Sequence, residues 1–364
     1  EETPLQPDAQ QSAGALEAKR VGGVNENGLF WLTIAHHNDG ESKLLSSTRA
    51  DISGEVGGVA RFATLVDEFR AASQCNENAN SDKGKSDPKG PPEANGDWRD
   101  CMVMISAGDN ILPGKELKIS LDKGVPYYDG LALDLIDYEA LAIGNHEFDQ
   151  GPDVFANLIS SFPITNATFI SSNLDVSGEP SLAALEAQGR IASSVVVREQ
   201  GRKIGIIGAT YEELAIVTSP RNVVATEVVP AVQAEIDRLT ADGVKIIILA
   251  SHLQGLDEDR MVVPMLSGVD VAIAGGGDEL LGNSWNSLFP DDVPAGPYPE
   301  WVMDADGKMV PLVTTTGGYR YLAKLVAGFN GKGELVTVKE EMSGPTRVAE
   351  VDGIGEDPEV KALV

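Results

Sequence analysis

Residues 140–151 read Ala-Leu-Ala-Ile-Gly-Asn-His-Glu-Phe-Asp-Gln-Gly, and they carry both a fold signal and a chemical signal. The four apolar residues Ala140–Ile143 are bounded by turn residues, which is typical of a short buried strand. A carboxamide, an imidazole and two carboxylates follow this strand at once. Ligands of an open α/β sheet bind outside the carboxyl ends of its strands, so this position indicates a candidate site.

Five further apolar runs are bounded by polar or turn residues in the same way. They are residues 30–35, 102–105, 203–207, 244–250 and 270–274. Amphipathic helical patterns lie between them: one follows the Gly57-Gly58 pair, and another starts at Pro230 and stops at Gly243. Alternating strands and helices predict an α/β fold rather than a helix bundle or an all-β sandwich.

The composition narrows the class of protein. The chain has 364 residues, 28 Lys and Arg against 56 Asp and Glu, a formal net charge of -28 and 42% hydrophobic residues. This apolar share is typical of a globular protein. The acidity would repel a phosphate backbone, so we expect no nucleic-acid partner. No apolar run reaches the roughly 18 residues of a membrane helix, so we expect no membrane span.

Three segments stand outside the strand and helix pattern. Residues 1–27 are polar and aperiodic, and we expect an extended N-terminal arm. Residues 28–345 form the predicted main domain, in which residues 74–101 are a polar insertion rich in Asn, Asp, Lys, Gly and Pro. Residues 346–364 are expected to be a linker or the start of a second domain.

The two cysteines of the chain, Cys75 and Cys101, bracket the polar insertion. We expect a disulfide that closes this loop and stabilises the fold by restricting the unfolded chain. Two buried free thiols are the alternative. A disulfide needs an oxidising compartment, so the pairing and the acidic surface together predict a periplasmic or extracellular (secreted) protein.

Polar residues at five strand ends form an ordered set. They are Asp39, Glu41, Asp109, Asn145, His146, Asp149, His252 and Asp278. Taken singly, an Asp after a strand is commonly a helix cap, and a His is commonly structural. Carboxylates, a carboxamide oxygen and imidazoles that converge in one cleft make a metal site, and five such strand ends in order favour that interpretation.

The order of these residues resembles that of the calcineurin-like metallophosphoesterases, especially their 5'-nucleotidase branch, which includes secreted bacterial alkaline phosphatases. Five blocks follow the family order: GGVARFATLVDEFRA (57–71), AIGNHEFDQG (142–151), SSNLD (171–175), KIGIIGAT (203–210) and TTTGGYRYLAKL (314–325). The resemblance covers about residues 30–338. It implies a four-layer α/β/β/α sandwich of two mixed sheets flanked by helices, with two divalent metal ions at the strand ends.

The resemblance also implies roles for individual residues. Asp39 would bind the first metal and Asp109 would bridge both metals. Asn145 and His252 would bind the second. His146 resembles the family histidine that contacts a phosphoryl oxygen or protonates the leaving group, with Asp149 as the carboxylate that orients it. Paired cations about 3.5–4 Å apart can activate a water and hold the attacking and leaving oxygens.

Three imidazoles of the family pattern are absent. Glu41 stands where the family has His, and Gly276 and Asp278 stand at the two His positions of its Gly-His-x-His run. The first site would then consist of Asp39, Glu41, Asp109 and Asp278. An all-carboxylate site favours Ca²⁺, Mg²⁺ or Mn²⁺, whereas the second site, short of one ligand, could take Mn²⁺, Zn²⁺ or Fe. A dead site with a tight glycine turn is the alternative; we favour a retuned site because two of three replacements are carboxylates.

Four ligand carboxylates would balance the charge of two divalent ions, so the centre would attract a phosphate dianion weakly. We therefore expect either a cationic helper, for which Lys43 and Arg49 lie nearby in the sequence, or a preference for less charged esters.

The sequence thus predicts a metal-dependent phosphomonoesterase of alkaline-phosphatase or 5'-nucleotidase type, with a small-molecule phosphate ester as substrate and a metal-activated hydroxide as nucleophile. A phosphodiesterase on the same scaffold and a catalytically silent binding domain are the alternatives. The resemblance does not extend to the separate C-terminal domain that contacts the nucleoside in the 5'-nucleotidase branch, so neither nucleotide specificity nor oligomeric state is predicted. We expect either a one-domain phosphatase or a gene that continues beyond Val364.

Overall fold

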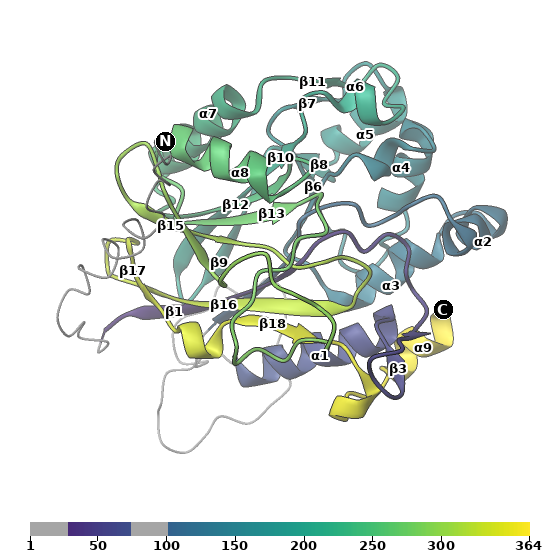
Figure 1. Ribbon diagram of the computed structural model, residues 1–364. Helices are drawn as coiled ribbons and strands as arrows, with labels where there is room; N and C mark the ends of the chain where they lie inside the picture. Colours follow the sequence, from purple (N-terminus) through teal and green to yellow (C-terminus); the bar gives the residue numbers. More distant parts are fainter. Residues whose placement is uncertain (1–27, 74–100) are drawn as a thin grey trace, which may run out of the picture.

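The structure is a computed structural model and describes residues 28–73 and 101–364. Within these residues two large β-sheets stack face to face (Figure 1). Helices α7 (Val228–Ala241) and α8 (Leu256–Val262) cover one sheet, and α1 (Val59–Ala72) and α3 (Tyr128–Ile136) cover the other. The predicted four-layer α/β/β/α sandwich of two mixed sheets is confirmed.

The first sheet contains eight of the described strands, in the order β17-β16-β1-β4-β5-β6-β8, with β18 paired to β16. Their bounds are β1 Phe30–His37, β4 Cys101–Ser106, β5 Ala140–Ala142, β6 Phe169–Ile170, β8 Ile191–Ala192, β16 Tyr321–Phe329, β17 Leu335–Val338 and β18 Gly344–Arg347. Strand β1 runs parallel to β4 and antiparallel to β16, so the sheet is mixed.

The second sheet contains six described strands, in the order β14-β15-β13-β12-β10-β9. Their bounds are β9 Ser194–Glu199, β10 Arg202–Thr210, β12 Ile246–His252, β13 Val271–Gly275, β14 Glu300–Met303 and β15 Met309–Val313. Strands β10, β12 and β13 are parallel to one another, and β9 is antiparallel to β10. Two short pairs complete the described strands: β2 Ser47–Thr48 with β3 Glu55–Val56, and β7 Leu174–Asp175 with β11 Val224–Ala225.

The helices not yet named line the outside of the sandwich or its rim. They are α2 Lys115–Lys123, α4 Pro152–Ile159, α5 Pro180–Ala187, α6 Leu214–Val217 and α9 Pro358–Leu363, with short 3-10 turns η2 His146–Phe148, η3 Val263–Met265, η4 Glu340–Met342 and η5 Glu350–Asp352. Helix α7 begins two residues before the predicted start at Pro230. Proline is tolerated there because the first N–H groups of a helix have no intrahelical acceptor. None of the helices in the described ranges has the length and apolar composition that a membrane crossing requires.

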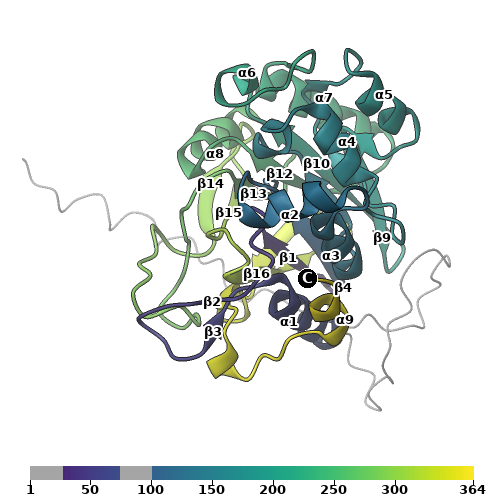
Figure 2. The same ribbon diagram turned by 90° about the vertical axis from the view of Figure 1, so that its right-hand side faces the viewer.

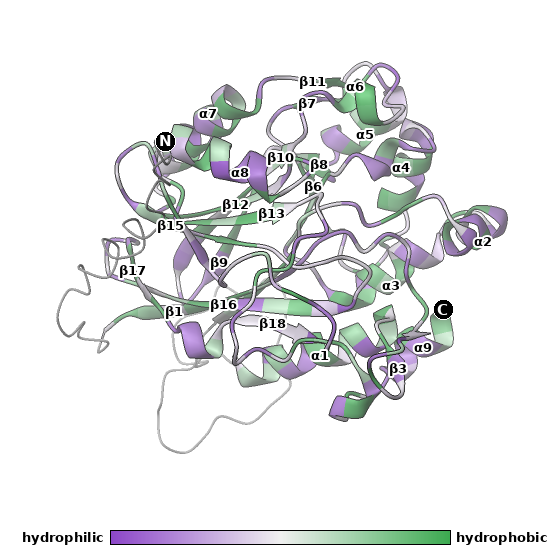
Figure 3. Cartoon of the chain, viewed as in Figure 1, coloured by the Kyte–Doolittle hydropathy of each residue, from purple (hydrophilic) through white to green (hydrophobic). Residues whose placement is uncertain are grey.

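The alternation of side chains along the strands fixes the layers. In β1, Leu32 and Ile34 are buried between the two sheets, whereas Ala35 packs in the helix layer with Phe62 of α1. Figure 3 shows apolar residues along β12 and β13 in the centre of the molecule. Helix α2 at the rim is more hydrophilic. Because neighbouring parallel strands share a direction, the segments that follow β1, β4 and β5 emerge at one edge, as do those after β12 and β13.

Residues 346–364 pack on the rest of the fold. The backbone N–H of Asp357 donates to the carbonyl of Ala60 in α1 at 2.9 Å, and Val360 of α9 is buried. Figure 2 shows α9 beside α1. The predicted domain boundary at residue 345 stays a prediction. The predicted arm at residues 1–27 and the predicted insertion at residues 74–101 lie outside the described residues, except for Cys101, and stay predictions too. The predicted disulfide involves Cys75 and therefore also lies outside them.

Candidate metal centre

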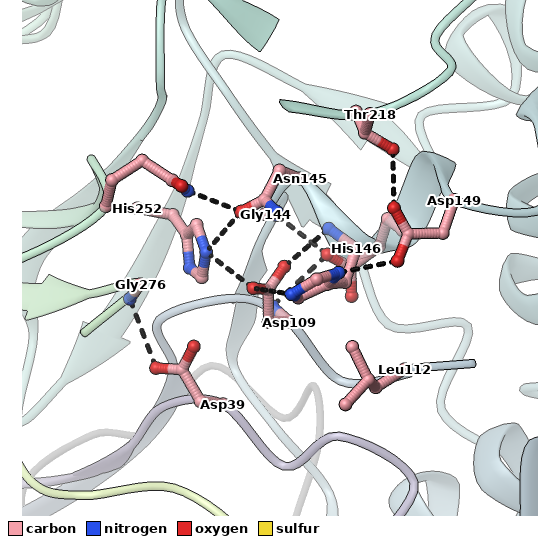
Figure 4. A network of polar contacts seen from close by, with 12 residues as sticks. Asp39, Asp109, Leu112, Gly144, Asn145, His146, Asp149, Thr218, His252 and Gly276 are labelled. Atoms are coloured by element: carbon pink, nitrogen blue, oxygen red, sulfur yellow. Dashed lines mark hydrogen bonds and ion pairs between the residues drawn. The ribbon is translucent and has the colours of Figure 1, made fainter. Parts of the chain in front are cut away.

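Three of the predicted metal ligands meet at the edge where the strands end. Asp39 follows β1, Asp109 follows β4 and His252 is the last residue of β12, and all three are buried. One donor atom of each lies within 4.8 Å of the donor atoms of the other two. Figure 4 shows the carboxylate of Asp109 facing the imidazole of His252. This geometry supplies two oxygen donors and one nitrogen donor for a cation.

The hydrogen bonds of His252 suit it to bind a cation. Its Nδ1 donates to the backbone carbonyl of Ala107 at 2.7 Å. Its Nε2 lies 2.9 Å from Asp109 Oδ2 and 3.1 Å from Asn145 Oδ1. Three atoms that can bind a metal therefore face one another. A backbone acceptor at one ring nitrogen fixes the tautomer that presents the other nitrogen to a metal. The donor set therefore fits a divalent ion.

The electrostatics of the cluster lead to the same conclusion. Burial raises the pKa of Asp39 to about 7, the positive charge of His252 lowers it, and the negative charge of Asp109 raises it. Burial lowers the pKa of His252, but the charge and hydrogen bond of Asp109 outweigh burial and raise this pKa to about 10. Two carboxylates removed from water thus require a positive charge between them.

The backbone at the two aspartates is held in an uncommon conformation. Asp39 and Asp109 both have φ 52, in the left-handed region that non-glycine residues rarely adopt. The two loops support each other: the N–H of Asp39 donates to Gly108 O at 3.0 Å, and the N–H of Glu41 donates to Asp109 O at 2.9 Å. Such strain persists only where the surroundings fix it, and it is concentrated at functional sites.

His146 and Asp149 form a hydrogen-bonded pair beside the cluster. His146 Nδ1 donates to Asp149 Oδ2 at 2.6 Å, and its Nε2 lies 3.8 Å from Asp109 Oδ2. Burial lowers the pKa of His146, while the charges of Asp109 and Asp149 and the hydrogen bond to Asp149 raise it above the ordinary value. Because the His146 side chain is 30% exposed, it can reach a bound substrate. An imidazole oriented in this way can transfer a proton.

Glu41 and Asp278 lie near this cluster but are not part of it within the described residues. Glu41 is half-buried. Burial raises its pKa, the charges of Lys43 and His146 lower it, and those of Asp109 and Asp278 raise it. Asp278 is exposed. Glu41 therefore interacts electrostatically with Asp109 of the centre and with Asp278, and the role of the two carboxylates as ligands of a first metal stays a prediction.

Known proteins are similar to this chain in sequence and in fold. No protein-family model matches the chain. A 5'-nucleotidase of Bos taurus is 29% identical over 342 residues, which are 91% of this chain and 51% of that protein. The structure of a 5'-nucleotidase precursor from Thermus thermophilus has a TM-score of 0.75 at 28% identity and covers 92% of this chain and 57% of its own. A calcineurin-like phosphoesterase from Bacillus subtilis has a TM-score of 0.60 at 18% identity, covers 92% of this chain and 96% of its own, and shares the fold.

The chain is similar in sequence to 5'-nucleotidases and shares its fold with a calcineurin-like phosphoesterase. It spans about half the length of the curated relatives it matches. The resemblance inferred from the sequence is therefore confirmed at the level of the family, whereas the assignment of individual ligands stays a prediction.

Gly276 replaces one histidine of the metallophosphoesterase pattern, and the structure gives this glycine a different role. Its backbone N–H donates to Asp39 Oδ2 at 3.1 Å. It has φ 89, and a Cβ atom at this position would lie only 2.7 Å from the backbone nitrogen of Gln254. A histidine therefore does not fit this backbone.

Three residues that contact the predicted site residues were not themselves predicted. Glu147 accepts hydrogen bonds from the N–H groups of Gly144 at 2.8 Å, Asn110 at 2.7 Å and Asp109 at 3.2 Å, and so joins the loops after β4 and β5. The Thr218 hydroxyl donates to Asp149 Oδ1 at 2.7 Å (Figure 4). Gln254 Nε2 donates to Asn145 Oδ1 at 2.6 Å. Only Glu147 carries a sequence signal, since it follows His146 directly.

Of the two candidate cationic helpers, Arg49 is engaged elsewhere. Its guanidinium pairs with Asp51 at 2.9 Å and with Asp292 at 2.7 Å, and it lies over the ring of Phe289. Lys43 is exposed, and its charge acts on Glu41. Proximity in sequence to Asp39 therefore misleads for Arg49, whereas the charge of Lys43 acts on Glu41 beside the centre.

Two of the four histidines are structural. His36 Nε2 and His37 Nε2 contact the hydroxyl groups of Tyr298 at 2.8 Å and Tyr138 at 2.7 Å. Burial lowers the pKa of each to about 3, so both are neutral core residues.

Proposed function

We propose that this chain is the catalytic part of a metal-dependent phosphomonoesterase. One observation carries the proposal. Asp39, Asp109 and His252 present donor atoms within 4.8 Å of one another, and the hydrogen-bonded pair of His146 and Asp149 lies beside them. A cluster of cation-binding side chains next to an oriented imidazole suits hydrolysis of a phosphate ester, and the relatives are named 5'-nucleotidases.

In this proposal Asp39 would hold the first ion, Asp109 would hold both, and Asn145 and His252 would hold the second. When bound, divalent cations supply a polarised water nucleophile and neutralise charge on the phosphoryl oxygens. Glu41 and Asp278 would complete the first site, which then suits Ca²⁺, Mg²⁺ or Mn²⁺. The nitrogen of His252 suits the second site to Mn²⁺, Zn²⁺ or Fe.

The chain's own groups would position the substrate and move the proton. His146 donates a hydrogen bond from Nδ1 to Asp149, which leaves Nε2 directed toward the side of Asp109 and available to the substrate. From there Nε2 can donate a proton to the leaving oxygen or a hydrogen bond to a phosphoryl oxygen. Thr218 would hold Asp149, and hence His146, in this orientation.

The charge around the centre bears on the substrate. Asp109, Glu41 and Asp278 bring negative charge together, while Arg49 is paired with Asp51 and Asp292. Such a centre attracts a dianionic monoester less than a monoanionic diester, other things equal. We therefore keep a phosphodiesterase as the second candidate, and a nucleoside monophosphate as the monoester to test first.

Activity of metal-reconstituted protein tests the proposal. Chelated protein is titrated with Mn²⁺, Mg²⁺, Ca²⁺ or Zn²⁺, ions per chain are counted by elemental analysis, and hydrolysis of AMP, p-nitrophenyl phosphate and bis-p-nitrophenyl phosphate is measured. We expect monoester hydrolysis that needs added ions and falls in Asp109→Asn. Faster turnover of the diester would select the phosphodiesterase. A protein that holds no stoichiometric metal and hydrolyses none of the esters would be a silent binding domain.

We also propose that the chain works in an oxidising compartment, periplasmic or extracellular. The support is the pair Cys75 and Cys101 around a polar insertion, and the acidic composition. Intact mass with and without a thiol-alkylating reagent under non-reducing conditions tests the disulfide. Alkylation of both thiols in the purified native protein would contradict it.

A further inference from the structure

The second metal site lacks one donor of the family pattern, and the place of that donor is taken by backbone. Asp109, Asn145 and His252 remain as protein donors. A side chain at Gly276 would begin 3.1 Å from His252 Nε2, on the side of the site, but only 2.7 Å from the backbone nitrogen of Gln254. The segment that follows β12 therefore lies where the missing imidazole would start.

Gln254 reaches the same site from this segment. It lies two residues after His252, is half-buried and has φ 80, which a residue other than glycine adopts only when its surroundings fix it. Its carboxamide contacts Asn145 Oδ1 at 2.6 Å, and the same oxygen lies 3.1 Å from His252 Nε2. The side chains of Gln254 and His252 thus converge on Asn145 Oδ1.

The chemistry of a carboxamide allows two states. The amide group carries an N–H donor and a carbonyl acceptor on one carbon, and a rotation of about 180° around the last side-chain bond exchanges them. Without a cation, Gln254 donates Nε2–H to Asn145 Oδ1. With a cation bound, Asn145 Oδ1 would be a ligand, and the carbonyl oxygen of Gln254 would be a hard donor beside it.

We propose that Gln254 supplies its side-chain oxygen to the second divalent ion, in place of the imidazole absent at Gly276. The inference rests on the proposed function, because it assumes that two ions bind. Replacing an imidazole with a neutral oxygen leaves the charge of the site unchanged. It also shifts the preference of the second site away from Zn²⁺ and toward Mn²⁺ or Mg²⁺.

Metal titration of Gln254 variants tests the inference without measuring activity. Chelated wild type, Gln254→Leu and Gln254→Glu are titrated with Mn²⁺ by isothermal calorimetry, and ions per chain are counted after dialysis. Leu removes the donor at similar size, whereas Glu keeps an oxygen donor but cannot donate a hydrogen bond to Asn145. The matched control is Gln188→Leu, at the exposed C-cap of α5. Thermal melting checks that each variant is folded.

We expect Gln254→Leu to weaken the second Mn²⁺ at least about tenfold, since loss of even an outer-shell partner has this effect. Gln254→Glu should bind it as tightly as wild type or more tightly, and Gln188→Leu should equal wild type. Unchanged binding in Gln254→Leu overturns the inference while the two-metal proposal stands. Equal loss in Gln254→Glu and Gln254→Leu also overturns it, because Gln254 would then only orient Asn145. Fewer than two ions in wild type overturn both.

Discussion

Replacing Thr218 with Val tests whether the pair of His146 and Asp149 acts on the substrate. The Thr218 hydroxyl donates to Asp149 Oδ1 at 2.7 Å, and His146 Nδ1 donates to Asp149 Oδ2 at 2.6 Å. Valine has nearly the same shape as threonine and removes only the hydroxyl group. The Asp149 carboxylate then keeps its charge but loses a hydrogen bond that fixes its orientation.

The structure sets the size of the effect. A hydrogen bond to a charged group contributes about 1.5–3 kcal/mol. The Asp149 side chain is 18% exposed, so water replaces part of the lost interaction and the lower end applies. Because about 1.36 kcal/mol corresponds to a tenfold change in rate, kcat/KM should fall about tenfold in Thr218→Val. His146→Ala removes the imidazole itself and should lower kcat/KM by about 10²–10⁴-fold.

The assay compares two monoesters with different leaving groups. The alkoxide leaving group of AMP needs a proton, whereas p-nitrophenolate leaves readily without one. If His146 protonates the leaving group, Thr218→Val and His146→Ala should impair AMP hydrolysis far more than p-nitrophenyl phosphate hydrolysis. If His146 holds a phosphoryl oxygen, both substrates should suffer equally.

The matched control is Thr168→Val, whose hydroxyl donates to the backbone carbonyl of Gly189 away from the centre. It should retain wild-type kcat/KM on both substrates. A folded Thr218→Val protein with wild-type kcat/KM on both would refute the link from Thr218 through Asp149 to catalysis.

Two further predictions concern stability, both measured by urea unfolding. Burial raises the pKa of Asp270 from 3.8 to about 7, and its carboxylate accepts the N–H of Ile247 at 2.9 Å. At Asp270 the folded state therefore binds more protons than the unfolded state between these values, so the contribution of this residue to wild-type stability should fall as the pH rises from about 4 to about 8, by up to about 4 kcal/mol. Other buried acids such as Glu139 and Asp259 add to the fall in the wild type. Asp270→Asn keeps an acceptor oxygen and should flatten this dependence; equal pH profiles would contradict the assignment. Glu147→Gln replaces an acceptor oxygen with an NH₂ group and deprives at least one of three backbone N–H groups of its acceptor, so it should lower the free energy of unfolding by about 1–3 kcal/mol. The exposed control Glu186→Gln should change the free energy of unfolding little. An equally small change in Glu147→Gln would contradict a stabilising role for the three hydrogen bonds that Glu147 accepts.

The sequence predicts the strands and the site residues that follow them because both depend on local pattern. The buried run at residues 140–143 and its polar continuation predict β5 and the position of Asn145 and His146 at its end. Asp109 follows β4 of the first sheet and His252 ends β12 of the second, so the stacking of the two sheets brings these strand ends together.

The residues that the sequence does not predict are those whose partners come from tertiary packing. Thr218 contacts Asp149 only because the segment after α6 folds back over η2, and no spacing in the sequence encodes this. Arg49 illustrates the opposite error. It is close to Asp39 along the chain, yet its charge is paired with Asp292, 243 residues away.

The backbone links the fold to the chemistry of the centre. Asp39 and Asp109, with φ 52, and Gln254, with φ 80, are residues other than glycine held in left-handed conformations. Each stands two or three residues after a strand end. The buried strands β1, β4 and β12 that precede these residues resist the relaxation that would relieve the strain. In this interpretation the apolar core does more than stabilise the sandwich, since it holds three charged or polar side chains in positions that a flexible loop would not maintain.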